Sequence, residues 1–111
     1  MKLKPTMNEV ITTPKISFVV ADETMNERPY RVIIENDDVT AMDFVVMVLT
    51  GIFALSLDTA VQVMLTAHQH GEALVTVLPY QDATERVYEA HALARSNGYP
   101  LRFYLEPDGS A

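Results

Sequence analysis

The sequence contains no cysteine in its 111 residues. Without cysteine there is no disulfide framework and no thiolate metal site, and the composition fits a reducing compartment. Basic residues are also few, because eight Lys and Arg stand against fifteen Asp and Glu, giving a net charge of −7. A chain this acidic is not expected to bind nucleic acid through its general surface.

Long apolar runs are absent as well. No stretch is suited to the hydrophobic part of a secretory signal or to a membrane-spanning helix, so we expect a soluble cytoplasmic protein with no membrane partner. The length suits one domain, and 49% hydrophobic residues are ordinary for a folded core.

The basic residues are unevenly spread along the chain. All three lysines lie in the first 29 residues, whereas residues 30–111 hold four arginines and eleven acids, which accounts for the whole net charge. This shift predicts a flexible N-terminal extension (1–29), a core (30–106) and a C-terminal tail (107–111). Ile16, Phe18 and Val20 alternate as in a strand, so the extension is either a loose tail or an arm that orders against a partner.

The centre of the chain combines a strand, a polar turn and the start of a helix. Residues 32–34 are β-branched, which favours a buried strand. Thr40, with Asp43 three residues later, has the pattern of a side-chain cap at a helix start. Residues 36–38, Asn-Asp-Asp, either form an ordinary turn or present oxygen atoms to a cation, and the stretch alone does not decide.

Hydrophobic spacing predicts the remaining elements. Helices are predicted over 42–53, between Ser56 and Gly71, and over 81–97, with further strands over 73–78 and 101–105. The order β-α-α-β-α-β corresponds to an α+β fold, in which three helices pack on one face of a small three-stranded antiparallel sheet.

The second predicted helix carries a histidine on its apolar face. That face comprises Ala60, Val61, Met64, Leu65 and His68. A histidine near a helix C-terminus is either a satisfied core side chain or a functional group. His70 is expected to face solvent.

Three motifs resemble those of the ClpS adaptor family. Residues 30–46 follow its signature of a tyrosine, a basic residue, aliphatic residues and Asn-Asp-Asp, followed by Thr, Met, an acid, Phe and Val. Residues 60–73 are similar to its Ala-x-x-x-Met-Leu-x-Val-His-x-x-Gly-x-Ala motif, and Pro100 and Leu101 open the last strand. Together the motifs cover the chain from about Tyr30 to Leu105.

The resemblance implies a binding protein and not an enzyme. ClpS proteins bind N-degrons, substrates with a bulky hydrophobic N-terminal residue such as Leu, Phe, Tyr or Trp, and deliver them to a Clp AAA+ unfoldase and its protease. By resemblance, Asn36, Asp37 and His68 would hold the free α-amino group of the substrate. The side chain would enter a pocket formed by Ile34, Asp38, Thr40, Met42, Val45, Met64, Ala67 and Leu101.

The resemblance also implies a partner and a setting. The partner would be the N-terminal domain of a ClpA- or ClpC-type unfoldase, docked near Gln81 and Arg86, where family members often carry Glu and Lys. We expect a monomer without metal or cofactor, in the cytoplasm or, for a plastid protein, the stroma. Val39, Ala41 and Ala67 depart from the usual aromatic, proline and valine, and Ala67 would leave the pocket roomier.

The implied chemistry agrees with the residue types. An α-ammonium group has three donors and one positive charge, which the Asn36 oxygen, the Asp37 carboxylate and a neutral His68 nitrogen can accept. Each such charge-assisted bond contributes roughly 1.5–3 kcal/mol. Burial of a Leu or Phe side chain adds about 1.5–3 kcal/mol.

Two other classes of function stay open from the residues alone. Asp37, Asp38 and His68 could serve acid–base chemistry or, with His70, a weak metal site, although residues two apart on a helix do not face one ion. The chain could also be a structural interaction domain or an unfoldase regulator that no longer binds N-degrons. Failure to bind any N-terminal residue would favour this last class.

Overall fold

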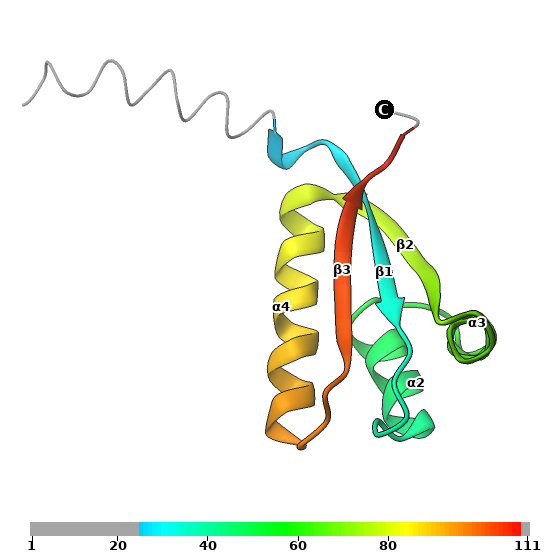
Figure 1. Cartoon of the computed structure of the whole chain (residues 1–111). Coiled ribbons are helices and arrows are strands. Elements are labelled where there is room, and N and C mark those ends of the chain that lie inside the picture. The colour runs from blue at the N-terminus through cyan, green and yellow to red at the C-terminus, as the bar shows by residue number, and fades with distance from the viewer. Residues whose placement is uncertain (1–24, 110–111) are drawn as a thin grey trace, which may run out of the picture.

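The computed structural model describes residues 25–109, which form a three-stranded sheet and three helices (Figure 1). The elements are β1 (Pro29–Glu35), α2 (Met42–Gly51), α3 (Leu57–His70), β2 (Glu72–Pro79), α4 (Tyr80–Ser96) and β3 (Arg102–Pro107). The strands are antiparallel in the order β2-β1-β3. The predicted α+β fold and element order are confirmed, while the strand-like pattern at residues 16–20 lies outside the described residues.

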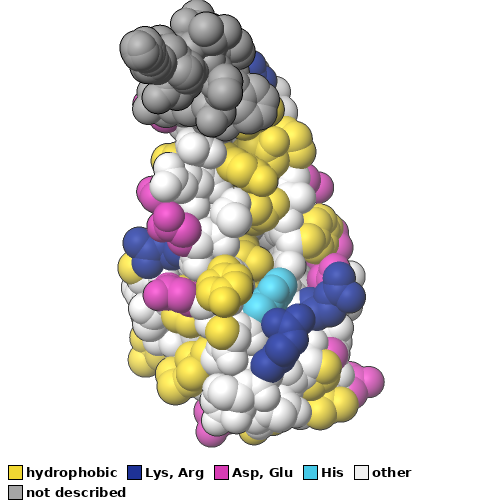
Figure 2. Space-filling model, turned by 90° about the vertical axis from the view of Figure 1, so that its left-hand side faces the viewer, with side chains coloured by type: hydrophobic (Ala, Val, Ile, Leu, Met, Phe, Trp, Pro, Cys, Tyr) yellow, Lys and Arg dark blue, Asp and Glu magenta, His cyan; other side chains and the backbone are white. Residues whose placement is uncertain are grey.

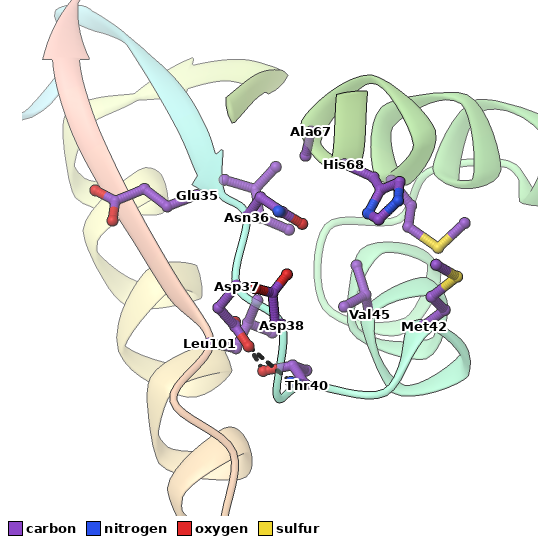
Figure 3. A pocket seen from close by; sticks show the side chains of 12 residues that line it. Glu35, Asn36, Asp37, Asp38, Thr40, Met42, Val45, Ala67, His68 and Leu101 are labelled. Atoms are coloured by element: carbon purple, nitrogen blue, oxygen red, sulfur yellow. Dashed lines mark hydrogen bonds between the residues drawn. The ribbon is translucent and has the colours of Figure 1, made fainter. Parts of the chain in front are cut away.

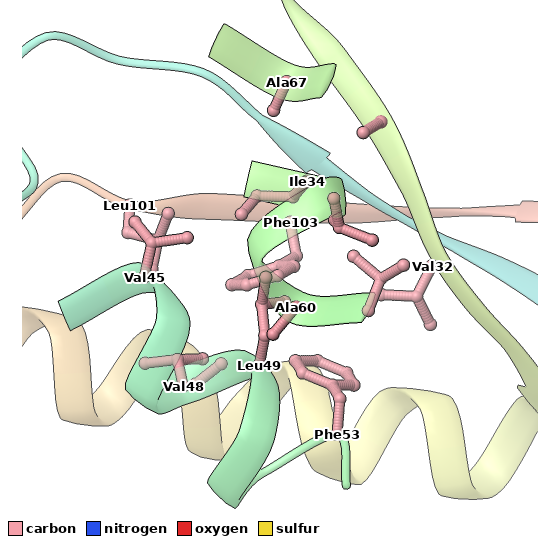
Figure 4. Packing of buried hydrophobic residues seen from close by; sticks show 14 of the residues in the cluster. Val32, Ile34, Val45, Val48, Leu49, Phe53, Ala60, Ala67, Leu101 and Phe103 are labelled. Carbon is pink, nitrogen blue, oxygen red and sulfur yellow. The ribbon is translucent and has the colours of Figure 1, made fainter. Parts of the chain in front are cut away.

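The central strand β1 decides which face of the sheet is covered. Val32 and Ile34 are 0% and 2% exposed and join a core cluster with residues from all three helices (Figure 4). Ile33 points to the opposite face, where it is paired with Leu74 of β2 and Tyr104 of β3. The helices therefore pack on the Val32–Ile34 side, as the sequence predicts.

Small residues bring α4 close to the sheet. Ala83, Ala90 and Ala94 are completely buried, so the helix backbone can approach the strands without a gap. Within the core, the rings of Phe53 and Phe103 pack with their centroids 5.1 Å apart. Among the described residues, no helix has the length and apolar character needed to cross a membrane.

Helix α3 has the predicted ends. Ser56 Oγ accepts a hydrogen bond from the Thr59 N–H at 3.2 Å, which caps the first turn. Gly71 takes a left-handed conformation with φ of 92°, and its N–H donates to the Ala67 carbonyl at 2.8 Å. This turn leads directly from the helix into β2.

The buried face of α3 differs from the prediction. Ala60, Val63 and Ala67 are buried, whereas Leu65 is 37% exposed. Helical spacing allows several neighbouring stripes on an apolar helix, and contact with β2 and α2 selects the stripe that includes Val63.

Both ends of α2 also differ from the prediction. Ala41, not Thr40, is the N-cap residue, and its side chain forms no capping bond. The helix ends at Gly51 and does not reach Phe53, which nevertheless lies in the core from the following loop. Ala54 in that loop has a positive φ of 59°.

Candidate functional site

A pocket opens where β1 ends, between the loop of residues 36–40, the start of α2 and the last turns of α3 (Figure 3). Its lining comprises Ile34, Glu35, Asn36, Asp37, Asp38, Thr40, Met42, Val45, Met64, Ala67, His68 and Leu101. Every residue that the sequence analysis assigned to the α-amino group or to the side-chain pocket therefore lines this one cavity.

The Asp37 carboxylate organises the loop. Its Oδ1 accepts the N–H groups of Val39 at 2.8 Å and Thr40 at 2.7 Å, and its Oδ2 accepts the Thr40 hydroxyl at 2.9 Å. Aspartate favours such turns because its side chain reaches backbone donors two and three residues ahead. Thr40 therefore donates back to Asp37 and does not cap α2, which corrects the predicted capping box.

A backbone bond joins this loop to the end of α3. The Asn36 N–H donates to the Gly71 carbonyl at 2.9 Å. Because Gly71 ends α3, this bond holds the loop beside the helix turn that carries Ala67 and His68. Figure 3 shows the Asn36 amide pointing toward His68, with the Asp38 carboxylate directed into the same space and Asp37 turned to Thr40.

The rest of the cavity is apolar, and its side chains are more exposed at the edge than at the inner wall. Leu101, Ala67 and Val45 are 4%, 3% and 8% exposed and form its inner wall. Met42 is 51% exposed and stands at the edge, where its unbranched thioether can adjust to the shape of a ligand. The cavity thus has a polar rim on one side and an apolar interior.

Glu35 also lines the cavity, although the sequence motifs do not assign it to the site. Glu35 precedes Asn36 and ends β1, so its proximity to the Asn-Asp-Asp turn was the available signal. Its side chain points away from His68 in Figure 3. Asp37 and Asp38 give the rim two carboxylates, and no Lys or Arg lines the cavity, which favours a cationic group there.

The metal site considered from the sequence does not form in the described residues. Within residues 25–109, no group of three or more His, Cys, Asp and Glu side chains is arranged to hold a metal ion.

The two predicted docking residues lie on α4, outside the pocket. Arg86 Nη1 donates to the Ile52 carbonyl at 2.8 Å, and Gln81 Nε2 contacts a Glu85 oxygen at 3.4 Å. Both residues are exposed, so they belong to a surface separate from the cavity.

Comparison with known proteins gives the family. The sequence pattern described as "ATP-dependent Clp protease adaptor protein ClpS" matches residues 25–104. The chain belongs to the ClpS family. ClpS proteins are non-catalytic adaptors of the Clp protease, which confirms the expectation of a protein that is not an enzyme.

Individual relatives extend this match over nearly the whole chain. A ClpS 1 adapter of Rhodopseudomonas palustris is 45% identical over 102 residues, covering 92% of this chain and 99% of the relative. A ClpS 2 adapter of Mesorhizobium japonicum is 39% identical over the same length and coverage. The structure of Agrobacterium tumefaciens ClpS2 bound to L-phenylalaninamide is 40% identical with a TM-score of 0.70, covering 74% of this chain and 99% of that one.

Proposed function

We propose that this ClpS protein binds substrates through a free α-amino group and a bulky hydrophobic first side chain, and delivers them to a Clp unfoldase. One observation carries the proposal. A single cavity combines the polar rim of Asn36, Asp38 and His68 with an apolar interior. Such a cavity suits a group with a positive charge at one end and a hydrocarbon body at the other.

The rim matches an ammonium group. The Asn36 oxygen and the imidazole of His68 can each accept one N–H, and a carboxylate supplies negative charge. Asp37 already accepts three donors within its own loop, so it contributes charge and holds Asn36 and Asp38 in place. Asp38, which bonds to none of these loop groups, is the better placed carboxylate for direct contact.

The interior matches the first side chain of a degron. Val45, Ala67 and Leu101 are buried in the core cluster, whereas Met42 and Met64 can repack around different shapes. The related Agrobacterium protein binds L-phenylalaninamide, which has a free α-amino group and an aromatic side chain. Its chemistry supports the same class of ligand for this chain, extended to Leu, Tyr and Trp.

Delivery requires a second surface. We assign it to the N-terminal part of α4, where Gln81 and Arg86 face solvent, and its partner to the N-terminal domain of a ClpA- or ClpC-type unfoldase. The adaptor would act as a monomer in the compartment that holds this unfoldase, the bacterial cytoplasm or the plastid stroma. We assign handover to the extension over residues 1–29, whose last residue, Pro29, already pairs in the sheet, and degron binding to residues 30–106.

The test is a titration of labelled peptides that begin with Leu, Phe, Tyr, Trp, Ile or Met. A peptide that begins with N-acetyl-Leu is the control, because acetylation removes the charge and two donors while it keeps the side chain. We expect micromolar affinity for the free Leu and aromatic peptides and at least tenfold weaker binding of the acetylated one. If no free peptide binds, the chain is instead an unfoldase regulator that has lost degron recognition.

A further inference from the structure

A basic cluster stands out on this acidic protein. It consists of His91 and Arg95, one turn apart on α4, and Arg102, the first residue of β3. The Phe103 N–H donates to His91 Nε2 at 3.0 Å, which fixes the ring beside the start of β3. Figure 2, which shows the α4 side of the molecule, has Lys and Arg side chains gathered beside a histidine.

Both guanidinium groups act on the charge of this ring. Burial lowers the pKa of His91, and the charges of Arg95 and then Arg102 lower it further. The bond from Phe103 also needs a lone pair on Nε2 that only the neutral ring offers. The positive charge of the cluster therefore comes from the two arginines.

Neither arginine has an ion-pair partner among the described residues, although Arg102 lies across the sheet from Glu35. The ion pair of this sheet joins Arg31 to Glu106, and Arg86 is bonded to a carbonyl, but Arg95 and Arg102 form no ion pair within residues 25–109. Two like charges held together and exposed attract an anionic group more strongly than an isolated arginine does.

The cluster continues from the edge of the cavity. Arg102 follows Leu101, which lines the cavity, and pairs across β1 and β3 with Glu35, which also lines it. Arg102 therefore joins the cluster to the residues at the edge of the cavity.

We propose that this cluster, His91 with Arg95 and Arg102, binds acidic side chains in the segment of a substrate that follows its N-terminal residue. The proposal rests on the function proposed above and specifies the substrate class. Acidic residues directly behind the first residue would lie near Asp37 and Asp38 and be repelled, so the favourable position lies further along the chain.

The test uses labelled peptides that begin with Leu and carry a Glu-Glu pair moved stepwise away from the N-terminus. Each is compared with the same peptide carrying Gln-Gln. We expect at least one placement to bind about two- to fivefold tighter than its Gln-Gln control, the range for exposed charge pairs, with a gain that shrinks as salt is added.

Variants locate the effect. Arg95→Gln with Arg102→Gln should remove the gain while leaving the affinity for the Gln-Gln peptides unchanged. Arg28→Gln removes one exposed charge next to the start of α4, at the opposite end of that helix from Arg95, and should keep the gain. The NMR signals of the His91 ring should shift with the Glu-Glu peptide and not with its Gln-Gln partner.

Each outcome has a distinct meaning. The inference is overturned if no Glu-Glu placement raises the affinity, or if the increase persists in the double variant. In either case, binding of the neutral Leu peptides would still support the proposed degron site. Equal binding of an N-acetylated Glu-Glu peptide also overturns it, because the cluster would then bind anions independently of the degron. If neutral Leu peptides do not bind at all, the proposed function fails and the inference fails with it.

Discussion

The Thr40 hydroxyl donates to Asp37 Oδ2 over 2.9 Å, while Asp37 Oδ1 holds the Thr40 N–H at 2.7 Å. This double connection makes Asp37 the anchor of the loop that carries Asn36 and Asp38. Asp37 therefore has two separable roles, one in the geometry of the loop and one in its charge.

Asp37→Ala should lower stability by about 1–2 kcal/mol, the usual loss for a side chain that caps backbone donors. It should also weaken binding of a free Leu peptide at least tenfold, because the loop and the charge are both lost. Asp37→Asn keeps an oxygen for the two N–H groups, so its stability should be close to that of the wild type. Its affinity for the peptide should still be lower than that of the wild type. Thermal unfolding and fluorescence anisotropy measure the two effects.

The control for this pair is Asp58→Ala, which removes an exposed carboxylate from the first turn of α3, outside the cavity. If Asp37→Ala and Asp58→Ala weaken peptide binding equally, recognition of the peptide's α-amino group does not depend on this loop.

The fold was predictable from the sequence because its signals are local and agree. The β-branched residues 32–34 favour a strand. Helix α3 is capped by Ser56 at its start and by Gly71 at its end. Thr40 misled because Thr can cap a helix or donate to a nearby carboxylate, and the loop conformation makes the choice. The stripe of α3 that includes Val63 was missed because the sheet, not the helix, selects the buried face.

The members of the candidate site were predictable through the family motifs, and the structure brings all of them to one cavity. The separate roles of these residues could not be predicted from the sequence. Asp37 and Asp38 are chemically identical in the sequence, and only the loop shows that Asp37 is turned to Thr40 while Asp38 points into the cavity. Glu35 was missed because it belongs to the strand and not to the Asn-Asp-Asp turn, yet it ends β1 at the edge of the cavity.

Ala67→Val tests the shape of the cavity. Ala67 is 3% exposed and forms part of the inner wall, so two added carbons reduce the space for a ligand. We expect Trp and Tyr peptides to lose about tenfold in affinity while Leu peptides change little, since overpacking typically costs about 1–3 kcal/mol. A uniform change across all peptides would show that the side chain of residue 67 does not select the ligand.

Ala54→Gly should stabilise the protein. Ala54 has φ of 59°, a left-handed conformation that is unfavourable for alanine by roughly 1–2 kcal/mol and is readily adopted by glycine. Part of this gain is offset because glycine has more freedom in the unfolded chain, so we expect a net increase of about 0.5–1 kcal/mol. Urea unfolding measures it, with Ala92→Gly on the exposed side of α4 as a control that should destabilise.

Removal of residues 1–24 tests the proposed extension. This cut leaves Pro29 in place, which pairs with Pro79 in the sheet, so the core should stay folded. We expect unchanged peptide affinity and slower degradation of a degron-bearing reporter by the Clp protease. Unimpaired degradation would show that handover does not need these residues, and weaker peptide binding would place them near the cavity instead.

The last prediction concerns His91 and acid stability. Burial, followed by the charges of Arg95 and Arg102, places the pKa of His91 below its ordinary value of 6.5. The unfolded chain therefore binds a proton more readily than the folded one. This contribution to stability is fully present above about pH 6.5 and declines as the pH falls below it. Protonation also removes the acceptor for the Phe103 N–H.

His91→Gln keeps an acceptor in reach of Phe103 but does not titrate, so its unfolding free energy should fall less between about pH 7 and 5 than that of the wild type. Urea unfolding across this range measures the difference, and carboxylates that titrate in both proteins cancel in the comparison. His70→Gln, which replaces an exposed histidine at the end of α3, is the control for the loss of one imidazole elsewhere. The same slope for His91→Gln and the wild type would show that the neutral ring does not link β3 to α4 in solution.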